Sequence, residues 1–213
     1  MNTSDLLALL ALVVSLASFG IAWFTFLQQY IKRADLQIDL GRRVLLAYGK
    51  DTTWLEATIS ISLTNAGARD ALVTEIAGTL ENADQTWQEP VLWYAFYKPT
   101  DAGKPGETSA PWWSFDGWAT PILVSSRQST ARSVAFNVGP IPITTPLQAG
   151  GYSLKLRFTI HGGKVPESDW TASFALDEAD QRALEQTVGD GNEGPSVEAT
   201  LGVTERITPP SSR

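Results

Sequence analysis

The search for chemistry begins with His161, the only histidine among the 213 residues. It precedes Gly162-Gly163, a setting typical of a turn, and no G-x-S-x-G segment supplies a nucleophile for Ser-His-Asp catalysis. The chain also lacks cysteine, which excludes thiolate nucleophiles, disulfides and metal sites built on several His or Cys side chains. These residues predict neither a catalytic centre nor a metal site.

Carboxylates offer a different chemistry, since a pair of them can hydrolyse a glycosidic bond. The candidates Glu56, Glu75 and Asp116 lie on separate segments, and no pattern predicts that two of them converge. The acidic segment 190–193 holds oxygen ligands suited to calcium but lacks the spacing of an EF-hand loop. We therefore predict a non-enzymatic protein without a cofactor or a bound metal.

Aromatic residues are the remaining candidates for contact with a partner or ligand. Trp112, Trp113, Phe115 and Trp118 occur in a Pro- and Gly-rich connection from Lys98 to Trp118, and connections of this length are often functional. Two interpretations stay open. Exposed tryptophans beside Pro and Gly form a rigid contact patch, or the same side chains fold back and close one end of the domain.

The elements that would position these residues are mainly β-strands. Apolar and polar residues alternate from Ala34 onward, most clearly between Ala57 and Leu63. The expected strands are 36–40, 44–48, 57–63, 72–80, 91–97, 122–125, 132–138, 152–160 and 171–176. Asn65-Ala66-Gly67 has turn residues and predicts that the strands before and after it are antiparallel neighbours. This number of short strands indicates a sandwich or a barrel.

The C-terminal part of the domain adds two elements. Glu178 to Gln186 has a short helical pattern with Asp177 as its N-cap, and residues 196–203 could form one more strand. A flexible tail is expected at the end of the chain. The predicted organisation is 1–33 for a transmembrane helix and its basic flank, 34–205 for a β-sandwich domain, and 206–213 for the tail.

One local pattern favours the sandwich. Leu147, Gly150, Tyr152 and Leu154 lead into an alternating strand, and this pattern resembles the tyrosine corner of immunoglobulin-like domains. The resemblance implies an antiparallel, disulfide-free sandwich in which Leu154 takes the core position that a cysteine has in antibody domains. The alternative is that Tyr152 is a half-exposed aromatic residue of a strand.

The N-terminal segment predicts a membrane anchor. Leu6 to Leu27 is an uninterrupted apolar run that reaches about 33 Å as a helix, enough to cross a hydrocarbon core of about 30 Å. A cleaved signal peptide is the competing interpretation, with small residues at Ser15-Leu16-Ala17. The absence of Lys and Arg from Met1 to Asp5 and the length of the run favour the anchor.

Small residues recur along this run at spacings of three and four and form a stripe on one helix face: Ala8, Ala11, Ser15, Ser18, Ala22 and Thr25. Small side chains let a second helix approach closely within lipid. The stripe predicts contact with other transmembrane helices of a complex or with a second copy of the chain. The alternative is that these residues reflect the ordinary composition of membrane helices.

The flanks of the run predict its orientation. Trp23 and Tyr30 are suited to a membrane interface, and the positive charge that begins at Lys32 and Arg33 lies on the C-terminal side. The positive-inside bias therefore places the domain in the cytoplasm, and a periplasmic or extracellular domain is the alternative. The net charge of −7 and the lack of a basic stripe argue against nucleic-acid binding.

The layout as a whole resembles a known type of protein. A basic doublet Lys32-Arg33 precedes the strand Ala34–Leu40, and later segments read Leu63–Gly67, Gly151–Leu156 and Phe174–Asp180. The chain resembles uncharacterised prokaryotic single-pass membrane proteins with an immunoglobulin-like β-sandwich domain. This resemblance implies an architecture and no catalytic residues.

Two functions are consistent with these patterns. The first is a bacterial membrane-anchored interaction module, an accessory or structural subunit of a larger membrane complex that contacts the lipid bilayer and other helices. The second is an extracytoplasmic module that binds carbohydrate or a cell-wall ligand through the Trp-rich connection.

Overall fold

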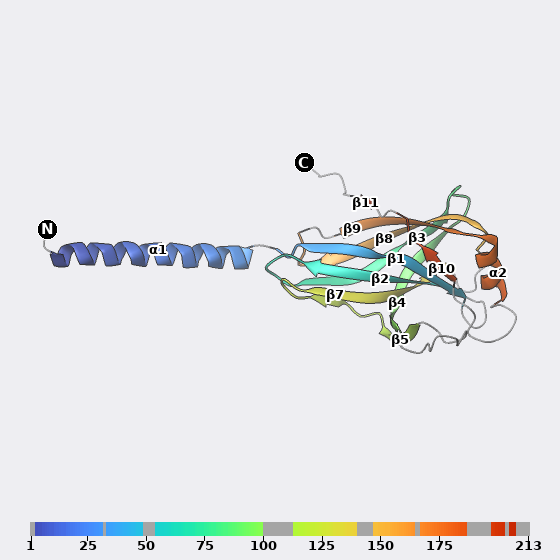
Figure 1. The fold of residues 1–213 in the computed structure, drawn as a ribbon, viewed down its shortest axis with the longest axis horizontal. Helices are drawn as coiled ribbons and strands as arrows, with labels where there is room; N and C mark the ends of the chain where they lie inside the picture. Colours follow the sequence, from blue (N-terminus) through green and yellow to red (C-terminus); the bar gives the residue numbers. More distant parts are fainter. Residues whose placement is uncertain are drawn as a thin grey trace.

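A long helix, α1, projects from a mainly antiparallel β domain in the computed structural model of the chain (Figure 1). The structure describes residues 3–31, 33–48, 54–99, 113–139, 147–164, 167–186, 197–202 and 205–207. The N-terminal apolar helix and the mainly β class predicted from the sequence are both confirmed.

The helix α1 spans Thr3–Ile31 and contains the apolar segment Leu9–Leu27, with a mean hydropathy of 2.1. None of this segment is buried against the rest of the chain. Its large side chains, such as Leu12 and Phe24, are exposed. By length and composition, α1 is able to cross a membrane.

Within the described ranges, eleven strands follow α1, and a short helix, α2, spans Glu178–Gln186. The strands are β1 (Leu36–Tyr48), β2 (Leu55–Asn65), β3 (Ala71–Asn82), β4 (Gln88–Pro99), β5 (Trp113–Trp118), β6 (Ile122–Val124), β7 (Ser129–Val138), β8 (Gly150–His161), β9 (Glu167–Leu176), β10 (Val197–Thr200) and β11 (Glu205–Ile207).

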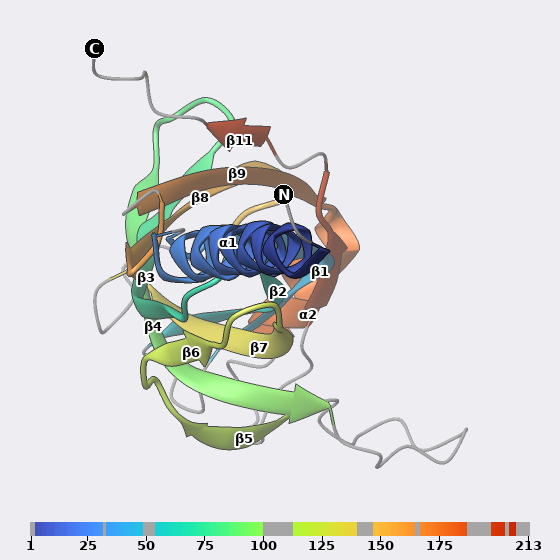
Figure 2. The same ribbon diagram turned by 90° about the vertical axis from the view of Figure 1, so that its left-hand side faces the viewer.

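These strands form one hydrogen-bonded sheet in the order β10-β1-β2-β7-β4-β3-β8-β9-β11, with β5 added to β4 and β6 added to β3. The sheet curls until its ends meet beside β10. Leu201 N donates to Arg42 O at 2.8 Å after β10 has paired with β1, and Gly202 N donates to Ser173 O of β9 at 2.5 Å. The sheet is therefore nearly closed and barrel-like (Figure 2).

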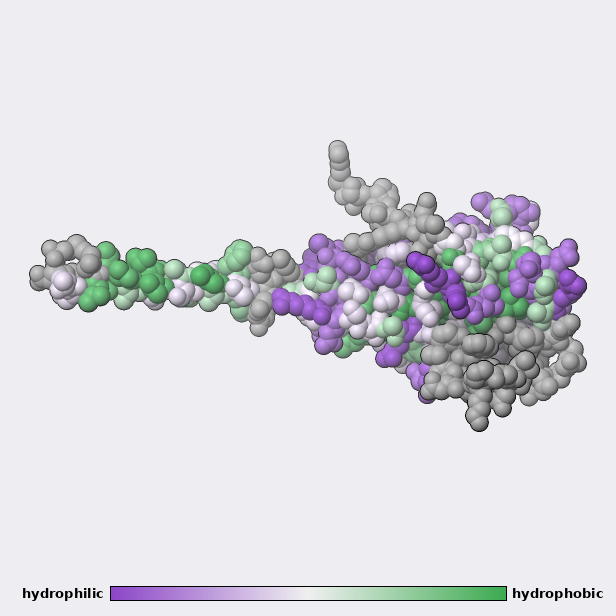
Figure 3. Space-filling view, viewed as in Figure 1, coloured by the Kyte–Doolittle hydropathy of each residue, from purple (hydrophilic) through white to green (hydrophobic). Residues whose placement is uncertain are grey.

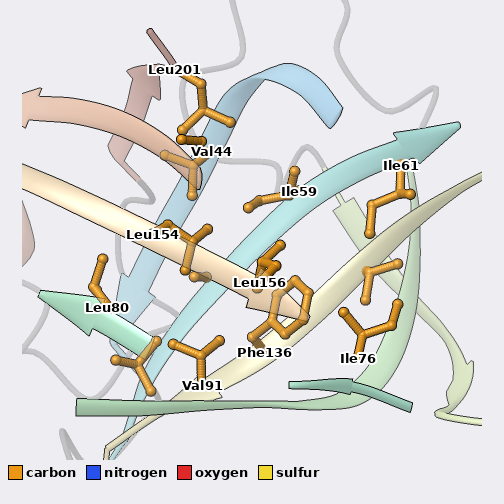
Figure 4. Close-up of a cluster of buried hydrophobic side chains, with 14 of the residues drawn as sticks. Val44, Ile59, Ile61, Ile76, Leu80, Val91, Phe136, Leu154, Leu156 and Leu201 are labelled. Atoms are coloured by element: carbon orange, nitrogen blue, oxygen red, sulfur yellow. The ribbon is translucent and has the colours of Figure 1, made fainter. Parts of the chain in front are cut away.

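The inward side chains of alternating strand positions fill the core. Phe136 and Phe158 are among the largest fully buried residues, and Ile59, Leu154 and Leu156 converge with Phe136 from β2 and β8 (Figure 4). Apolar alternation in the sequence thus corresponds to one continuous core inside the curled sheet.

The predicted strands map onto observed ones, with two separate predictions joined. Segments 36–40 and 44–48 belong to the single strand β1, whose register against β2 shifts between Leu40 and Val44. This irregularity interrupts the alternation and explains why the sequence pattern breaks there. The predicted strand at 196–203 is present as β10, and β11 extends the pairing of the domain to Ile207, past the expected boundary at residue 205.

The predicted antiparallel pairing across Asn65-Ala66-Gly67 is wrong. The strand β2 pairs with β1 and β7, whereas β3 pairs with β4, β6 and β8. The buried Asn65 side chain explains the crossing, because its amide nitrogen donates to Arg69 O at 2.7 Å and to Val124 O at 3.1 Å. These bonds direct the chain toward β6 instead of back along β2.

The predicted connection from Lys98 to Trp118 also needs correction. The strand β4 continues to Pro99, and Trp113–Trp118 forms β5, which pairs with the C-terminal half of β4. Residues 100–112, including Trp112, lie outside the described residues. The segment from Lys98 to Trp118 is rich in Pro and Gly, so its composition did not indicate the strand at its C-terminal end.

The helix α2 has the bounds and the cap that the sequence predicts. Asp177 Oδ1 accepts hydrogen bonds from Ala179 N at 2.7 Å and from Asp180 N at 2.8 Å. Asp180 Oδ2 accepts in return from Asp177 N at 3.0 Å. These reciprocal bonds satisfy amide groups that the first turn of a helix leaves without a backbone partner.

Candidate functional site

Four aromatic side chains gather on the outer face of β4 and β5. We call Tyr94, Tyr97, Phe115 and Trp118 the outer aromatic cluster. Tyr97 pairs with Phe115 in the β4–β5 register, and their rings meet edge to face with centroids 6.2 Å apart. Trp118 contacts Phe115 at 5.1 Å and Tyr94 at 6.5 Å between centroids.

A β-bulge places both tyrosines on the same face of β4. The register against β7 shifts between Trp93 and Ala95, so Tyr94 is an extra residue in β4. Residues three apart on a regular strand point to opposite faces, and a bulge removes that restriction. The two tyrosine hydroxyls consequently lie 3.4 Å apart.

Both tyrosines reach a carboxylate on β2. The Tyr94 and Tyr97 hydroxyls donate to Glu56 Oε2, the latter at 3.2 Å. Thr58 Oγ1 donates to Glu56 Oε1 at 3.2 Å. Burial of the phenol, followed by its hydrogen bond to Glu56, raises the pKa of Tyr94 far above its usual value, so Tyr94 remains a neutral donor.

Two small residues lie under these tyrosines. Thr58 pairs with Ala135, and Ala135 pairs with Ala95, in adjacent strands. Thr58 is 4% exposed and Ala135 is 0% exposed, although both share the outer face with Glu56. Tyr94 and Tyr97 cross this row to reach Glu56, so the outer face has a small packed layer of its own.

The edge of this layer remains exposed. Trp118 is 70% exposed and Phe115 is 48% exposed. Leu92 on β4, the partner strand of β5, is also exposed, as is Leu123 on β6, which pairs with β3. Soluble proteins expose large apolar side chains singly, and a group of them marks a contact surface.

A shallow pocket of about 140 Å³ lies next to the cluster. It occupies the β3–β4 fork, the place where β3 and β4 stop pairing after Ala77 and Leu92. Beyond that point β3 pairs with β6, and β4 pairs with β5. The pocket is lined by Thr74, Glu75, Ile76, Leu92, Trp93, Ala119, Thr120 and Pro121.

The three candidate acids lie on three different strands and have different contacts. Glu56 accepts hydrogen bonds from three hydroxyls, Asp116 is 3.4 Å from Lys98 Nζ, and Glu75 lines the pocket. His161 ends β8 as an exposed residue before Gly162, which has a positive φ of 79°. Within the described residues, no group of three His, Asp or Glu side chains is placed to hold a metal ion.

Tyr152 makes the hydrogen bonds expected of a tyrosine corner. Its hydroxyl donates to Gln148 O at 2.8 Å and accepts from Gln148 N at 2.9 Å. The ring is buried and stacks on Phe174, with ring centroids 5.5 Å apart. The hydroxyl of Tyr48 accepts from the adjacent Leu147 N at 2.7 Å, a contact that sequence analysis did not anticipate.

The small residues of α1 have their side chains described except for Ala8: Ala11, Ser15, Ser18, Ala22 and Thr25 are exposed. The Ser18 hydroxyl donates to Val14 O and the Thr25 hydroxyl to Ile21 O, each at 2.8 Å. Such bonds satisfy a hydroxyl inside its own helix, so neither residue requires a polar partner in lipid.

The predicted membrane flank is described in part. Trp23 is exposed and stacks between Phe19 and Phe26, with ring centroids 6.3 and 5.9 Å away. Arg33 is exposed. Tyr30 belongs to α1, but its side chain and all of Lys32 lie outside the described residues, as does the side chain of Trp113.

The comparisons with known proteins do not assign the chain to a family. No protein-family model matches the sequence, and no curated protein matches it. Among solved structures, the ApaA protein from Bordetella pertussis is similar over 68% of this chain and 95% of its own, with 13% identity and a TM-score of 0.35.

Two other solved structures have comparable likeness. The sporulation control protein Spo0M from Bacillus subtilis matches 82% of this chain and 91% of its own, at 12% identity and a TM-score of 0.27. The CupB6 tip adhesin from Pseudomonas aeruginosa matches 79% of this chain and 51% of its own, at 11% identity and a TM-score of 0.28.

Proposed function

We propose that this protein is a non-enzymatic, membrane-anchored interaction module, an accessory or structural subunit of a larger membrane complex. The observation that carries the proposal is the exposed edge of the outer aromatic cluster, formed by Phe115 and Trp118 next to Leu92. Aromatic side chains on a rigid sheet contribute large contact area at a low cost in conformational entropy. The apolar helix α1 would anchor this surface at the membrane.

The hydrogen bonding of Glu56 supports a non-enzymatic role. Two tyrosine hydroxyls and the Thr58 hydroxyl already occupy its oxygens. A general base or nucleophile needs a carboxylate oxygen within reach of a substrate. Glu56 instead positions Tyr94 and Tyr97, which support the exposed rings of the cluster.

Loss of a co-purifying complex would test the contact surface. We expect Trp118→Ser to release the partner after gentle detergent extraction, because it removes the most exposed ring of the cluster. Gln88→Ser, at an exposed position of the neighbouring strand β4, should leave the partner bound. Equal retention by both variants, each with a wild-type circular dichroism spectrum, would contradict the proposal.

The small-residue stripe of α1 supports a second contact within the membrane. Leucine at Ala11, Ser15, Ser18 or Ala22 should weaken association with the complex, because each added side chain separates the helix backbones. Phenylalanine at Leu12 or Leu16, on other faces of α1, serves as the matched control. Retention that is the same in both sets would rule out helix docking.

The basic flank supports a cytoplasmic location for the domain. Arg33 directly precedes the domain, and positive charge is retained on the cytoplasmic side of membrane helices. Protease added to spheroplasts should leave the domain intact and should digest it only after the membrane is permeabilised. Digestion from outside would favour the extracytoplasmic alternative.

That alternative is carbohydrate binding, and the exposure of Trp118 specifically favours it. A sugar ring stacks on an exposed indole when hydroxyl groups lie nearby, and Tyr94 contacts Trp118. Titration with soluble cell-wall glycan fragments would then shift tryptophan fluorescence in the wild type and not in Trp118→Ala. The absence of a shift in both proteins would remove this function.

We also propose that the domain is an immunoglobulin-like sandwich, as the sequence pattern around Tyr152 suggests. The support is the bond between its hydroxyl and Gln148, together with the buried Leu154 two residues later. On the same grounds, we propose that the chain is similar to uncharacterised prokaryotic single-pass membrane proteins with such a domain. An experimental structure with a fully closed barrel would contradict the sandwich.

A further inference from the structure

The chain enters the β domain almost directly from the membrane helix. The helix α1 ends at Ile31, and Ala34 is already part of the domain, where its N donates to Gly162 O at 3.2 Å and its carbonyl accepts from Lys164 N at 2.9 Å. Three Cα steps separate Ile31 from Ala34, a reach of about 11 Å at most. The end of the domain that holds Ala34 therefore lies close to the end of α1.

Buried Asn65 and a close-packed glycine fix this attachment. Asn65 Oδ1 accepts from Asp35 N at 3.2 Å and from Gly67 N at 2.9 Å. A side chain at Gly67 would lie 2.4 Å from Asp35 N, so only glycine fits this contact. The attachment is thus built into the fold, and it determines which end of the domain faces the helix.

Basic residues gather at that end from segments far apart in the sequence. The turn after β2 carries Arg69, the turn before β7 carries Arg127, and the turn after β8 carries Lys164. All three residues and Arg33 are exposed, and we call these four the helix-proximal cations. Figure 3 shows hydrophilic surface where the domain meets α1.

Three carboxylates lie at the same end as these four cations, and one of them, Glu167 at the start of β9, is 3.8 Å from Arg157 Nε. Asp35 lies 3.7 Å from Lys164 Nζ, and Asp70 Oδ1 accepts from Ser126 N at 2.8 Å. His161, also exposed, faces the same end. The four helix-proximal cations outnumber Asp35, Asp70 and Glu167, and Glu167 is already paired with Arg157, so this end is positive on a chain whose total charge is −7.

The opposite end of the domain is acidic. It includes α2 and the turn between β3 and β4, and Figure 1 shows α2 at the end away from α1. Its described acids are Asp84, Asp177, Glu178, Asp180 and Glu185, against the single described cation Arg182 in the turn and in α2. The domain therefore has opposite charge at its two ends.

We propose that the helix-proximal cations bind the anionic headgroups of the lipid surface from which α1 emerges. This inference depends on the anchoring role of α1 given under the proposed function. The attachment reaches about 11 Å at most, which is comparable with the screening length of about 8 Å at physiological ionic strength, so the cations lie near the headgroup layer. Anionic lipid attracts this end and repels the acidic end, so the domain stands with α2 away from the membrane.

Single-cysteine labelling tests this contact, because the native chain has no cysteine. Gln128→Cys places a fluorophore at the helix-proximal end, and Gln148→Cys places the same fluorophore at the far end; both glutamines are exposed. The full chain is reconstituted in vesicles of phosphatidylcholine, with or without phosphatidylglycerol, and each vesicle carries a headgroup-attached quencher. Phosphatidylglycerol should increase quenching of the label at residue 128 and leave the label at residue 148 unchanged.

Charge-matched variants separate this contact from a general effect of charge. The increase in quenching should disappear in a triple variant, Arg69→Gln, Arg127→Asn and Lys164→Gln, and at high salt. Asparagine replaces Arg127 because that residue has a positive φ of 58°, which asparagine tolerates. A control variant, Arg42→Gln, Arg43→Gln and Arg182→Gln, removes equal charge elsewhere and should keep the increase.

The outcomes distinguish the anchor from the headgroup contact. A chain that floats with neither type of vesicle would overturn the anchor and the headgroup contact together. A chain that floats with both types but shows the same quenching at residue 128 in each would overturn only the headgroup contact. Loss of the increase in the control variant as well as in the triple variant would also overturn it.

Discussion

Tyr94 donates its hydroxyl to Glu56 across Ala135, so that residues of β4 and β2 are joined over the intervening strand β7. This relationship gives the outer face a packed layer of its own, with the carboxylate on one side and the exposed rings of Phe115 and Trp118 on the other. The exposed aromatic surface is consequently held by the sheet and does not depend on a mobile loop.

Ala135→Leu should destabilise the domain, because a larger side chain under the two tyrosines forces them away from Glu56. Overpacking of this kind costs about 1–3 kcal/mol in the free energy of unfolding. Urea unfolding of the full chain in detergent, followed by circular dichroism, measures the change. Ala131→Leu, at an exposed position of the same strand β7, should change stability by less than about 0.5 kcal/mol. Equal losses in both variants would show that the layer is not packed as described.

Stability should fall at alkaline pH, and Tyr94 should account for part of the fall. Folding raises the pKa of Tyr94, through burial first and then its bond to Glu56. Its stabilising contribution is therefore complete below the unfolded-state pKa of about 10 and is lost as pH rises through the folded-state value. Tyr94→Phe should flatten the dependence of the unfolding free energy on pH above about 10.

Two controls accompany this pH profile. Tyr48 and Tyr152, whose pKa values burial also raises, should preserve a residual slope in Tyr94→Phe. Tyr30→Phe changes a tyrosine of α1, outside the domain, and should leave the profile unchanged. A wild-type slope in Tyr94→Phe would mean that Glu56 does not hold this phenol in its neutral form.

Tyr152→Phe should destabilise the domain by about 1–3 kcal/mol, since Gln148 N and Gln148 O both lose their partner. Tyr48→Phe removes the acceptor of the adjacent Leu147 N. Because both hydroxyls hold the same segment, a double-mutant cycle should give a coupling energy of about 0.5–3 kcal/mol. Strict additivity in chemical denaturation would show that the two tyrosines act independently.

Gly78→Ala should be severely destabilising, with a loss of about 3 kcal/mol or more. A Cβ at this position would lie 1.8 Å from Lys155 O on the paired strand β8, which leaves no space for a methyl group. Gly117→Ala is the matched control, because no atom lies within 4 Å of the added Cβ. Thermal unfolding monitored by circular dichroism compares the two variants, and similar midpoints would contradict this close approach of β3 to β8.

Periodicity in the sequence was sufficient to identify most elements. The apolar run of α1, the alternation of β2 and β8, and the cap at Asp177 each depend on residues close in sequence, so local physics determines them. The pairing across Asn65 was mispredicted because the partners of β2 and β3 depend on long-range bonds such as Asn65 to Val124. Strand β5 was predicted as part of a loop because its own residues lack a strand pattern. Its extended conformation depends on pairing with β4, its only partner among the described strands.

The cluster of Tyr94, Tyr97 and Glu56 could not be predicted from spacing. Alternation assigns Tyr94 and Tyr97 to opposite faces of a strand, and only the bulge in β4 brings them together. The aromatic residues of β5 were identified from the sequence as candidate contact residues because they occur together in a segment rich in Pro and Gly. That Tyr94 and Tyr97 contact these aromatic residues could be seen only from the register of β4 against β7.

The sequence by itself determined an apolar N-terminal helix, a mainly β domain and a shortage of catalytic residue types, because composition and short-range periodicity carry that information. The tertiary structure decided which strands pair, where the outer aromatic cluster forms, and that Arg69, Arg127 and Lys164 share one end of the domain with Arg33. These arrangements join residues separated by many positions in the chain. Their physical basis is the closing of the sheet, which no local pattern encodes.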